Sequence, residues 1–360
     1  MLYIDQLKAT SIRNLGEFHI EPGPKLNFFY GPNASGKTSV LETIYLLSRV
    51  KSFRSKRIHD VISCGEKILS VFAKGVKKDN LFTVGVEKGR GITKLKFNGE
   101  TIQTASEQAK KLPIYILTPE HHTIFTGTPK ERRHWLDWSL FHVEHDYLSI
   151  WKNYHRALRH RNALLKSEKI VNSSEMSGWE RMMSVEAQKI DKMRQNYLTD
   201  LCRLMNSNHI GFVLSGEAKI NYETNSSDTD LFELLIENRK ADIRRGYTGF
   251  GPHRADIEFS YEDFDVAKHL SRGQTKLYGA ALISSQIETL KAKDVSAIVL
   301  VDDIDAELDD DSSRKMLSLL LANDVQTFVS SLSVRDWVPK NINGHSMFHV
   351  KHGKIEKMLE

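Results

Sequence analysis

The sequence predicts an α/β fold in which a parallel-sheet head, decorated by β segments, carries a helical arm lobe inserted in the middle of the chain. Three observations support this prediction: a glycine-rich loop between an apolar run and an apolar helix, a second apolar run that ends in two acids, and a long proline-free interval between them. We expect residues 1–125 and 246–360 to be the two halves of one head, and residues 126–245 to form the mainly helical lobe.

The glycine-rich loop matches Gly-x-x-x-x-Gly-Lys-Ser/Thr without a mismatch and follows the strand-like run 26–30. In such a loop, backbone N–H groups and the N-terminus of the next helix bind phosphates, the lysine reaches the β and γ phosphates, and the hydroxyl ligates Mg²⁺. The sequence therefore predicts an ATP or GTP site. The expected contacts are Gly31, Pro32, Asn33, Ala34, Ser35, Gly36, Lys37, Thr38 and Ser39, with Lys37 also catalytic and Thr38 also on the metal.

The second apolar run, residues 297–301, ends in Asp302 and Asp303. This pattern is typical of a buried parallel strand that brings acids to its carboxyl end beside the phosphate loop, which is a Walker B site. We expect Asp302 to bind the nucleotide's Mg²⁺, usually through water. Asp303 stands where a general base could orient or deprotonate the attacking water.

A third motif, Ser271, Arg272, Gly273 and Gln274, begins a helix-compatible stretch before the acidic strand. Ser-x-Gly-Gln at a helix start is the signature of ATP-binding cassette ATPases, in which the hydroxyl, the glycine N–H and the helix dipole bind the γ phosphate of ATP held by another subunit. The fold class is therefore an ATP-binding-cassette-type P-loop NTPase head. Residues 306–309 occupy the place of the loop that couples the two sites of such a dimer.

The interval between the motifs reads mostly as helix. We expect helices over residues 151–166, 179–206 and 231–245, and a loop over 172–178. The apolar positions of the second helix recur at spacings of three and four, which indicates helix-on-helix packing. The insert is too short for a long coiled coil. Strand segments are expected over residues 68–86 and 93–98.

The whole chain resembles the RecF family of bacterial recombination mediators. The similarity includes residues 11–14, 51–54, 127–137, 154–158, 161–166, 249–256 and 270–274. This resemblance implies that Arg13 and Asn14 also contact the nucleotide. It implies ATP-dependent homodimers that bind gapped DNA or single-strand/double-strand junctions. It further implies weak ATP hydrolysis that releases the dimer, and cooperation with the RecO and RecR proteins in loading RecA.

The chain is only mildly basic, with a formal net charge of +5, but its cations gather in two clusters. Both clusters could contact DNA phosphates. A solvated basic helix face explains each cluster equally well. The candidate DNA contacts are Arg54, Lys56, Arg57, Lys152, Arg156, Arg159 and Arg161.

Two departures from the cassette pattern predict slow hydrolysis. Asp303 stands where most of these ATPases have glutamate, which is one methylene longer. The switch segment 326–331 contains no histidine to sense the γ phosphate, so Ser330 or Ser331 would have to substitute weakly. The glutamine-containing lid loop has no clear counterpart, and residues 117–120 are the candidate segment for it.

One alternative function remains from the motifs, which is the ATPase engine of a membrane transporter. The long insert and the basic clusters argue against it. We expect a cytoplasmic protein without a membrane partner, because the N-terminus does not resemble a signal peptide and no apolar stretch approaches spanning length. Cys64 and Cys202 are too far apart in sequence to indicate a disulfide framework or a cysteine zinc site.

Overall fold

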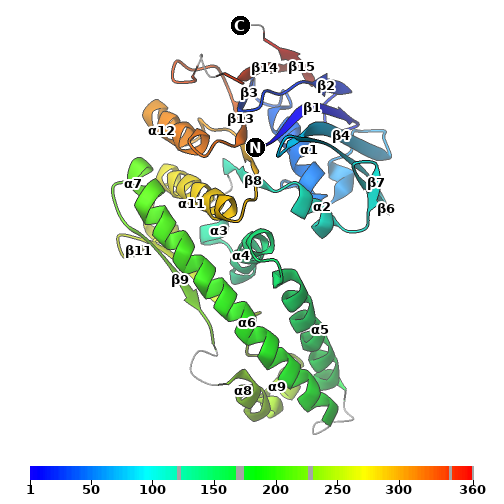
Figure 1. The fold of residues 1–360 in the computed structure, drawn as a ribbon, viewed down its shortest axis with the longest axis vertical. Helices are drawn as coiled ribbons and strands as arrows, with labels where there is room; N and C mark the ends of the chain where they lie inside the picture. The colour runs from blue at the N-terminus through cyan, green and yellow to red at the C-terminus, as the bar shows by residue number, and fades with distance from the viewer. Residues whose placement is uncertain (120–122, 168–173, 226–229, 340–342, 359–360) are drawn as a thin grey trace. The chain divides into compact units, whose positions relative to one another are not determined.

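The structure, a computed structural model, describes residues 1–119, 123–167, 174–225, 230–339 and 343–358. The chain forms two compact units, shown in Figure 1. We call Met1–His121, Asn208–Ser215 and Ser271–Glu360 the head unit, and His122–Ser207 and Gly216–Leu270 the arm unit.

The second boundary differs from the one expected at residue 246. Residues 246–270 belong to the arm unit, because strand β10 (Asp256–Tyr261) pairs with strand β9 (Ala218–Glu223) of that unit. No periodicity or motif in the sequence reveals this pairing.

The head unit contains a six-stranded, mostly parallel sheet in the order β15-β14-β3-β13-β12-β8. Strands β3, β8, β12 and β13 are buried along almost their whole length, as expected for a parallel sheet covered on both faces. β15 pairs antiparallel to β14 at one edge. The strands are β3 (Leu26–Tyr30), β8 (Ile114–Leu117), β12 (Ile298–Val301), β13 (Gln326–Ser331), β14 (Ser346–Lys351) and β15 (Lys354–Lys357).

A second head sheet is antiparallel, in the order β2-β1-β4-β5-β6-β7. Its inward residues alternate with half-buried or exposed ones, so one face belongs to the core and the other does not. Buried Gln326 joins the two sheets, because its side-chain amide bonds both the N–H and the carbonyl of Ile4. The strands are β1 (Leu2–Thr10), β2 (Phe18–Ile20), β4 (Ile68–Lys77), β5 (Asn80–Gly89), β6 (Ile92–Phe97) and β7 (Glu100–Ile102).

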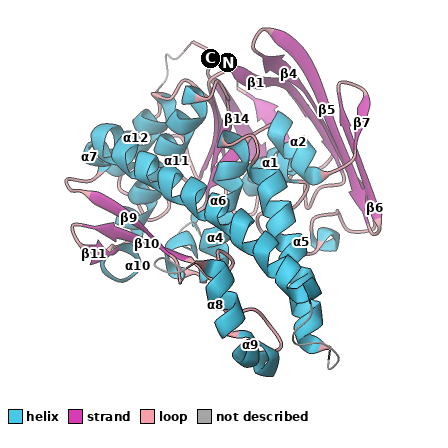
Figure 2. Cartoon of the chain, turned by 60° about the horizontal axis from the view of Figure 1, so that its bottom comes forward, coloured by secondary structure: helices cyan, strands magenta, loops and turns pink. Residues whose placement is uncertain are grey.

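Helix α1 (Lys37–Arg49) is buried along most of its length and lies in one apolar core with both sheets. Figure 2 shows α1 and α2 (Ala105–Lys111) on one face of the antiparallel sheet. The other head helices are α7 (Ile210–Val213), α11 (Arg272–Ala292), α12 (Asp310–Leu321) and the short 3₁₀ helix η1 (Ile58–Asp60). α7 packs on α11 and α12.

The arm unit is built on two long helices that pack together, α5 (Tyr147–Lys166) and α6 (Ser174–Leu204). A three-stranded sheet, β11-β10-β9, packs beside α6 and α4. The remaining elements are α3 (Thr123–Thr126), α4 (Pro129–Val143), α8 (Leu231–Glu237), α9 (Arg239–Arg245), β11 (Phe264–Asp265) and α10 (Val266–His269). The π-helical turn Met205–His209 continues α6, and its last two residues belong to the head unit. Within the described parts of both units, no helix has the length and apolar character needed to cross a membrane.

The expected helices are present with shifted ends. α5 begins before residue 151, α6 begins at Ser174 inside the expected loop, and the expected helix 231–245 is two helices, α8 and α9. The expected strand 68–86 is a hairpin, since Lys78 and Asp79 turn the chain with positive φ between β4 and β5. Part of the expected loop, residues 172 and 173, lies outside the described residues.

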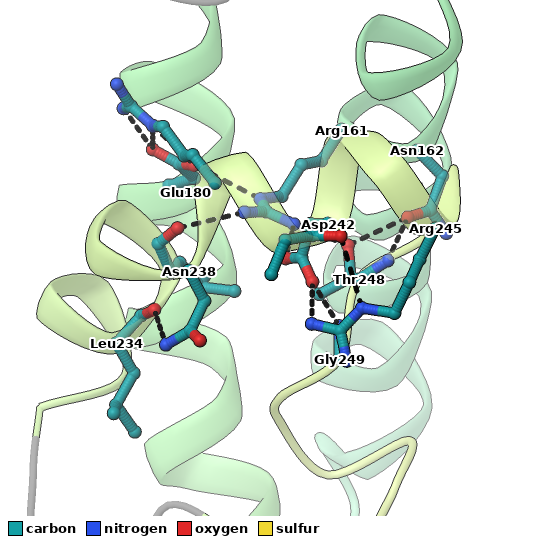
Figure 3. Close-up of polar contacts among 12 residues, drawn as sticks. Arg161, Asn162, Glu180, Leu234, Asn238, Asp242, Arg245, Thr248 and Gly249 are labelled. Atoms are coloured by element: carbon teal, nitrogen blue, oxygen red, sulfur yellow. Dashed lines mark hydrogen bonds and ion pairs between the residues drawn. The ribbon is translucent and has the colours of Figure 1, made fainter.

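A buried ion-pair network ties four arm helices together (Figure 3). Arg161 of α5 is fully buried, and its guanidinium bonds Glu180 of α6 at 3.1 Å and Asp242 of α9 at 2.7 Å. It also donates to the carbonyl of Leu235 in α8 at 3.0 Å. Arg239 supplies a second cation to Glu180, at 3.0 Å. The fork geometry of arginine lets a single side chain satisfy all three partners.

This burial removes Arg161 from the candidate DNA contacts. Its place in an acid-free cluster of cations suggested a basic surface, but at position 161 the helix turns its side chain inward toward two carboxylates. The charge count of a segment cannot distinguish these cases, because the two acids lie far away in sequence, on α6 and α9.

Replacing Arg161 with methionine would leave Glu180 and Asp242 buried with part of their compensating charge removed. Breaking a buried ion pair in this way costs about 3–5 kcal/mol. We therefore expect Arg161→Met to lower the midpoint of urea unfolding substantially, followed by circular dichroism. Arg159→Met, on the exposed face of the same helix, is the matched control and should leave the midpoint nearly unchanged. Equal midpoints for the two variants would contradict this account of the arm unit.

Candidate functional site

A cavity of about 490 Å³ lies at the carboxyl end of β3 in the head unit. Ten of the residues that the sequence assigned to the nucleotide site or to catalysis line it. These are Arg13, Asn14, Asn33, Ala34, Ser35, Gly36, Lys37, Thr38, Ser39 and Asp303. The lining also includes three residues that the sequence did not assign to it, Arg54, Asp60 and Ile62. We call this space the phosphate-loop cavity.

The phosphate loop is shaped by its backbone. Ala34 and Gly36 both have positive φ, 60° and 118°. The φ of Gly36 favours glycine, and a Cβ atom there would also lie 2.6 Å from Leu15 Cδ2. The N–H groups of the first turn of α1 have no partner within the helix and are free to bind an anion.

Lys37 is almost fully buried and holds the loop closed. Its Nζ donates to the carbonyls of Gly31 at 2.8 Å and Pro32 at 3.1 Å. Gly31 and Pro32 therefore do not line the cavity but position the lysine that does. A phosphate in the cavity would offer the ammonium group stronger, charged acceptors than these two carbonyls.

Asp302 lies at the end of β12 and accepts two hydrogen bonds on one carboxylate oxygen. Thr38 Oγ1 donates to its Oδ1 at 2.9 Å, and Ser330 Oγ donates to the same atom at 2.7 Å. Burial raises the pKa of Asp302, and the neighbouring Asp303 adds to this, while the two hydroxyls oppose it. The three residues come from three different segments, the start of α1 and the ends of β12 and β13.

Asp303 follows in a left-handed conformation, with φ 46°. Its N–H donates to Ser330 Oγ at 2.8 Å, and its carbonyl accepts from Lys276 Nζ at 2.6 Å. Ser330 therefore contacts both acids, a role different from the γ-phosphate sensing that the sequence suggested for one of the two switch serines. Ser331 instead bonds Asp305 at 3.0 Å.

Lys276 is a residue that the sequence reasoning missed. Its buried ammonium group also donates to the carbonyls of Ile304 and Ala306, at 3.2 and 2.9 Å. Burial lowers its pKa to about 8, although the neighbouring acids oppose the shift. The lysine thereby ties α11 to the segment that follows the acidic strand. No motif in the sequence indicates this role, because the three partners are backbone carbonyls.

Arg13 lines the cavity, but its guanidinium is already engaged. Both Nε and Nη2 donate to the buried carboxylate of Glu42 at 2.8 Å, and Nη1 donates to the carbonyl of Asp60 at 2.6 Å. Ser52 also donates to Glu42. Asn14 bonds the loop directly, with its Nδ2 3.0 Å from the carbonyl oxygen of Ala34. These contacts fix Asn14 against the phosphate loop and tie Arg13 and Ser52 to α1 through Glu42.

The four signature residues do not line the phosphate-loop cavity. Ser271 caps α11 in a reciprocal box, in which Ser271 Oγ accepts from Gln274 N–H and Gln274 Oε1 accepts from Ser271 N–H. Ser271, Arg272 and Gln274 are exposed. Gly273 lies so close to the following loop that a Cβ would be 2.7 Å from the carbonyl oxygen of Glu307. Arg272 and Glu307 form an ion pair at 3.2 Å.

The remaining candidate DNA contacts lie in two different parts of the chain. Lys56 and Arg57 are exposed near η1, whereas Arg54 of the same cluster lines the phosphate-loop cavity. Lys152, Arg156 and Arg159 are exposed on α5. The proposed lid segment ends at Glu120, which lies outside the described residues.

Comparison with known proteins identifies the family. Residues 3–355 match the family model described as the RecF/RecN/SMC N terminal domain. The chain is 34% identical to the DNA replication and repair protein RecF of Pseudoalteromonas translucida, over 98% of this chain and 99% of that protein. The chain belongs to the RecF family. A protein of the same name from Coxiella burnetii is 35% identical over 99% of both chains.

Solved structures agree on the fold. One described as the recombination mediator protein RecF-ATP in the RecFOR pathway superimposes with a TM-score of 0.87 at 24% identity, covering 99% of this chain and 98% of that chain. An SMC head bound to the C-terminal winged-helix domain of ScpA gives a TM-score of 0.61 at 17% identity, with 99% and 97% coverage. These superpositions show that the chain shares its fold with both proteins.

Proposed function

We propose that this RecF-family chain is an ATP-dependent DNA-binding protein of recombinational repair and replication-fork maintenance. Two copies would close on ATP, bind gapped or junction DNA, and cooperate with RecR and RecO in loading RecA. The family membership supports the process, since the relatives are named DNA replication and repair proteins and one solved neighbour is described with ATP in the RecFOR pathway. The observation that carries the proposal is the phosphate-loop cavity with its adjoining acids.

The cavity fits a nucleoside triphosphate. Gly36 lines the cavity at a positive φ, the first turn of α1 supplies N–H groups without a partner in the helix, and Lys37 lies at the cavity wall. Lys37 would exchange its two carbonyl acceptors for phosphate oxygens. Arg54, whose side chain also borders the cavity, could add positive charge there instead of contacting DNA.

The pair Thr38 and Asp302 fits Mg²⁺. Both offer oxygen ligands, which Mg²⁺ prefers, and the two oxygens lie 2.9 Å apart, with Thr38 in the cavity lining. These residues would hold the ion directly or through water. When bound, the ion would neutralise charge on the phosphates.

Asp303 would act as the base that orients the attacking water. Hydrogen bonds to Ser330 and Lys276 fix the Asp303 backbone, which limits the positions that its carboxylate can take. The shorter reach of aspartate supports weak hydrolysis, used as a switch that releases the assembly. Ser330 would position both Asp302 and Asp303 rather than contact the nucleotide itself.

A second copy of the chain would complete the site. Ser271, Arg272, Gly273 and Gln274 begin α11 with exposed polar groups and are absent from the lining of the cavity in their own chain. We propose that they bind the γ phosphate of the ATP in the other copy. Arg272 and Gly273 also contact Glu307, so the segment 306–309 would sense whether the signature of its own chain is engaged.

Replacing Ser330 with alanine removes the hydroxyl that bonds both acids. Hydrogen bonds to charged groups contribute about 1.5–3 kcal/mol, so we expect Mg-ATP hydrolysis to fall about ten- to hundredfold. ATP affinity should change much less, because the phosphate loop is untouched. Ser331→Ala is the matched control, since Ser331 bonds Asp305 instead. Similar hydrolysis by both variants, measured by phosphate release, would remove Ser330 from this role.

Fluorescence anisotropy of a labelled gapped duplex tests the proposed function directly. The full chain is titrated with ATP, with ADP and without nucleotide, and Lys37→Met serves as the nucleotide-binding control. We expect tight binding with ATP only, and none of this nucleotide dependence in the variant. If wild-type protein fails to bind DNA in every nucleotide state, the proposed function is wrong.

A further inference from the structure

The loop between α9 and β10 carries an exposed aromatic residue that the head chemistry does not use. The Tyr247 side chain is 44% exposed. The guanidinium carbon of Arg254 lies 4.7 Å from the centre of its ring, and that of Arg245 lies 5.9 Å away. A tyrosine beside arginines is typical of surfaces that stack an unpaired base. Every base has a π face for the ring, and the nucleic-acid backbone is anionic.

The buried network of Figure 3 holds this loop in place. Thr248, which is fully buried, donates from its N–H and its hydroxyl to Asn162 Oδ1, both at 2.8 Å. Arg161 donates to the Thr248 hydroxyl at 2.8 Å, and Asp242 accepts the N–H of Gly249 at 3.1 Å. Tyr247 is therefore exposed next to a rigid anchor. A preformed surface loses little conformational entropy when it binds.

The loop adjoins a line of exposed cations on α5. We call Lys152, Arg156, Arg159 and Lys166 the basic stripe. Their spacing of four, three and seven residues places them on one face of the helix, over about 21 Å. The side chain of Lys166 lies 3.8 Å from where a Cβ of Gly246 would be, so the stripe reaches the loop.

The basic stripe and the loop contain no acidic residue of their own. No acidic residue occurs between Trp151 and Lys166, or between residues 243 and 255. Among the described residues, Arg156, Arg159 and Arg254 form no ion pair with a carboxylate. The pKa of nearby His253 is lowered to about 4, first by burial and then by cations that include Arg254 and Arg133. A polyanion would find favourable charge along this surface.

We propose that Tyr247 stacks an unpaired base of DNA and that Arg254 beside it binds a phosphate of that strand, at the end of the phosphate-binding basic stripe. This inference rests on the proposed DNA-binding function and deepens it, since it assigns the unpaired strand of gapped or junction DNA to this loop. The stripe contacts phosphates of either strand type, whereas the exposed ring requires a base that is free to leave its partner.

The test compares single-stranded and duplex DNA on the full chain with ATP, by anisotropy of a labelled 20-nucleotide oligothymidine and a labelled duplex of equal length. We expect Tyr247→Ala to weaken single-strand binding about tenfold and to leave duplex binding within about twofold. Tyr247→Phe, which keeps the ring, should restore single-strand binding. Phe264→Ala, which removes another exposed arm-unit aromatic, should change neither.

Two further measurements separate stacking from simple charge. Quenching of 2-aminopurine in the oligonucleotide should disappear in Tyr247→Ala and persist in Tyr247→Phe. Arg254→Gln should weaken single-strand binding and reduce the slope of log affinity against log salt by about 0.7, the share of one phosphate contact.

Outcomes that overturn the inference differ from those that overturn the proposed function. Unchanged single-strand binding by Tyr247→Ala, or an equal loss for duplex, would remove the stacking role while leaving DNA binding intact. Failure of the wild-type chain to bind either DNA would remove the proposed function as well. Loss of binding only in a double variant, Arg156→Gln with Arg159→Gln, would leave a phosphate-binding stripe without a base contact.

Discussion

Strand β13 determines the geometry of the site, because it lies between β3 and β12 and pairs with both in parallel. The carboxyl ends of three neighbouring parallel strands must meet at one sheet edge, so the phosphate loop, Ser330 and Asp302 meet there. Two hydroxyls then converge on one carboxylate oxygen of Asp302. The cavity, the acids and their hydrogen bonds all depend on this pairing. Without it, the same motifs would be three separate loops.

Residues in contiguous motifs could be predicted from the sequence. The phosphate loop, the acidic strand and the capped helix at Ser271 each contain enough local pattern to identify the element and its chemistry. Residues whose role depends on partners far away in the sequence could not be predicted in this way. Arg161 looked like a surface cation until Glu180 and Asp242 were placed around it, and Arg54 looked like a DNA contact until its loop was placed at the cavity. Lys276 carried no motif at all, because its partners are backbone carbonyls.

In the arm unit, the buried and the exposed cations of helix α5 have different roles. Arg161 faces inward and uses its charge on two carboxylates, so the energy of its desolvation is compensated within the fold. Two residues earlier, Arg159 faces outward without such a partner among the described residues. The inward residue positions a loop through Thr248, and the outward residues leave their charge available to an anion. The buried ion pairs of Arg161 therefore hold in place the loop that lies beside the exposed cations of α5.

A site completed by a second copy is the central claim, and a mixing experiment tests it directly. Lys37→Met removes the phosphate-loop lysine, and Ser271→Arg blocks the signature, so neither variant can form ATP-dependent dimers alone. A mixture can form one intact site, from Lys37 of one copy and Ser271 of the other. Sedimentation velocity with ATP should therefore show dimers in the mixture and only single copies in each variant alone. A mixture that stays as single copies, or a variant that dimerises alone, would contradict the account.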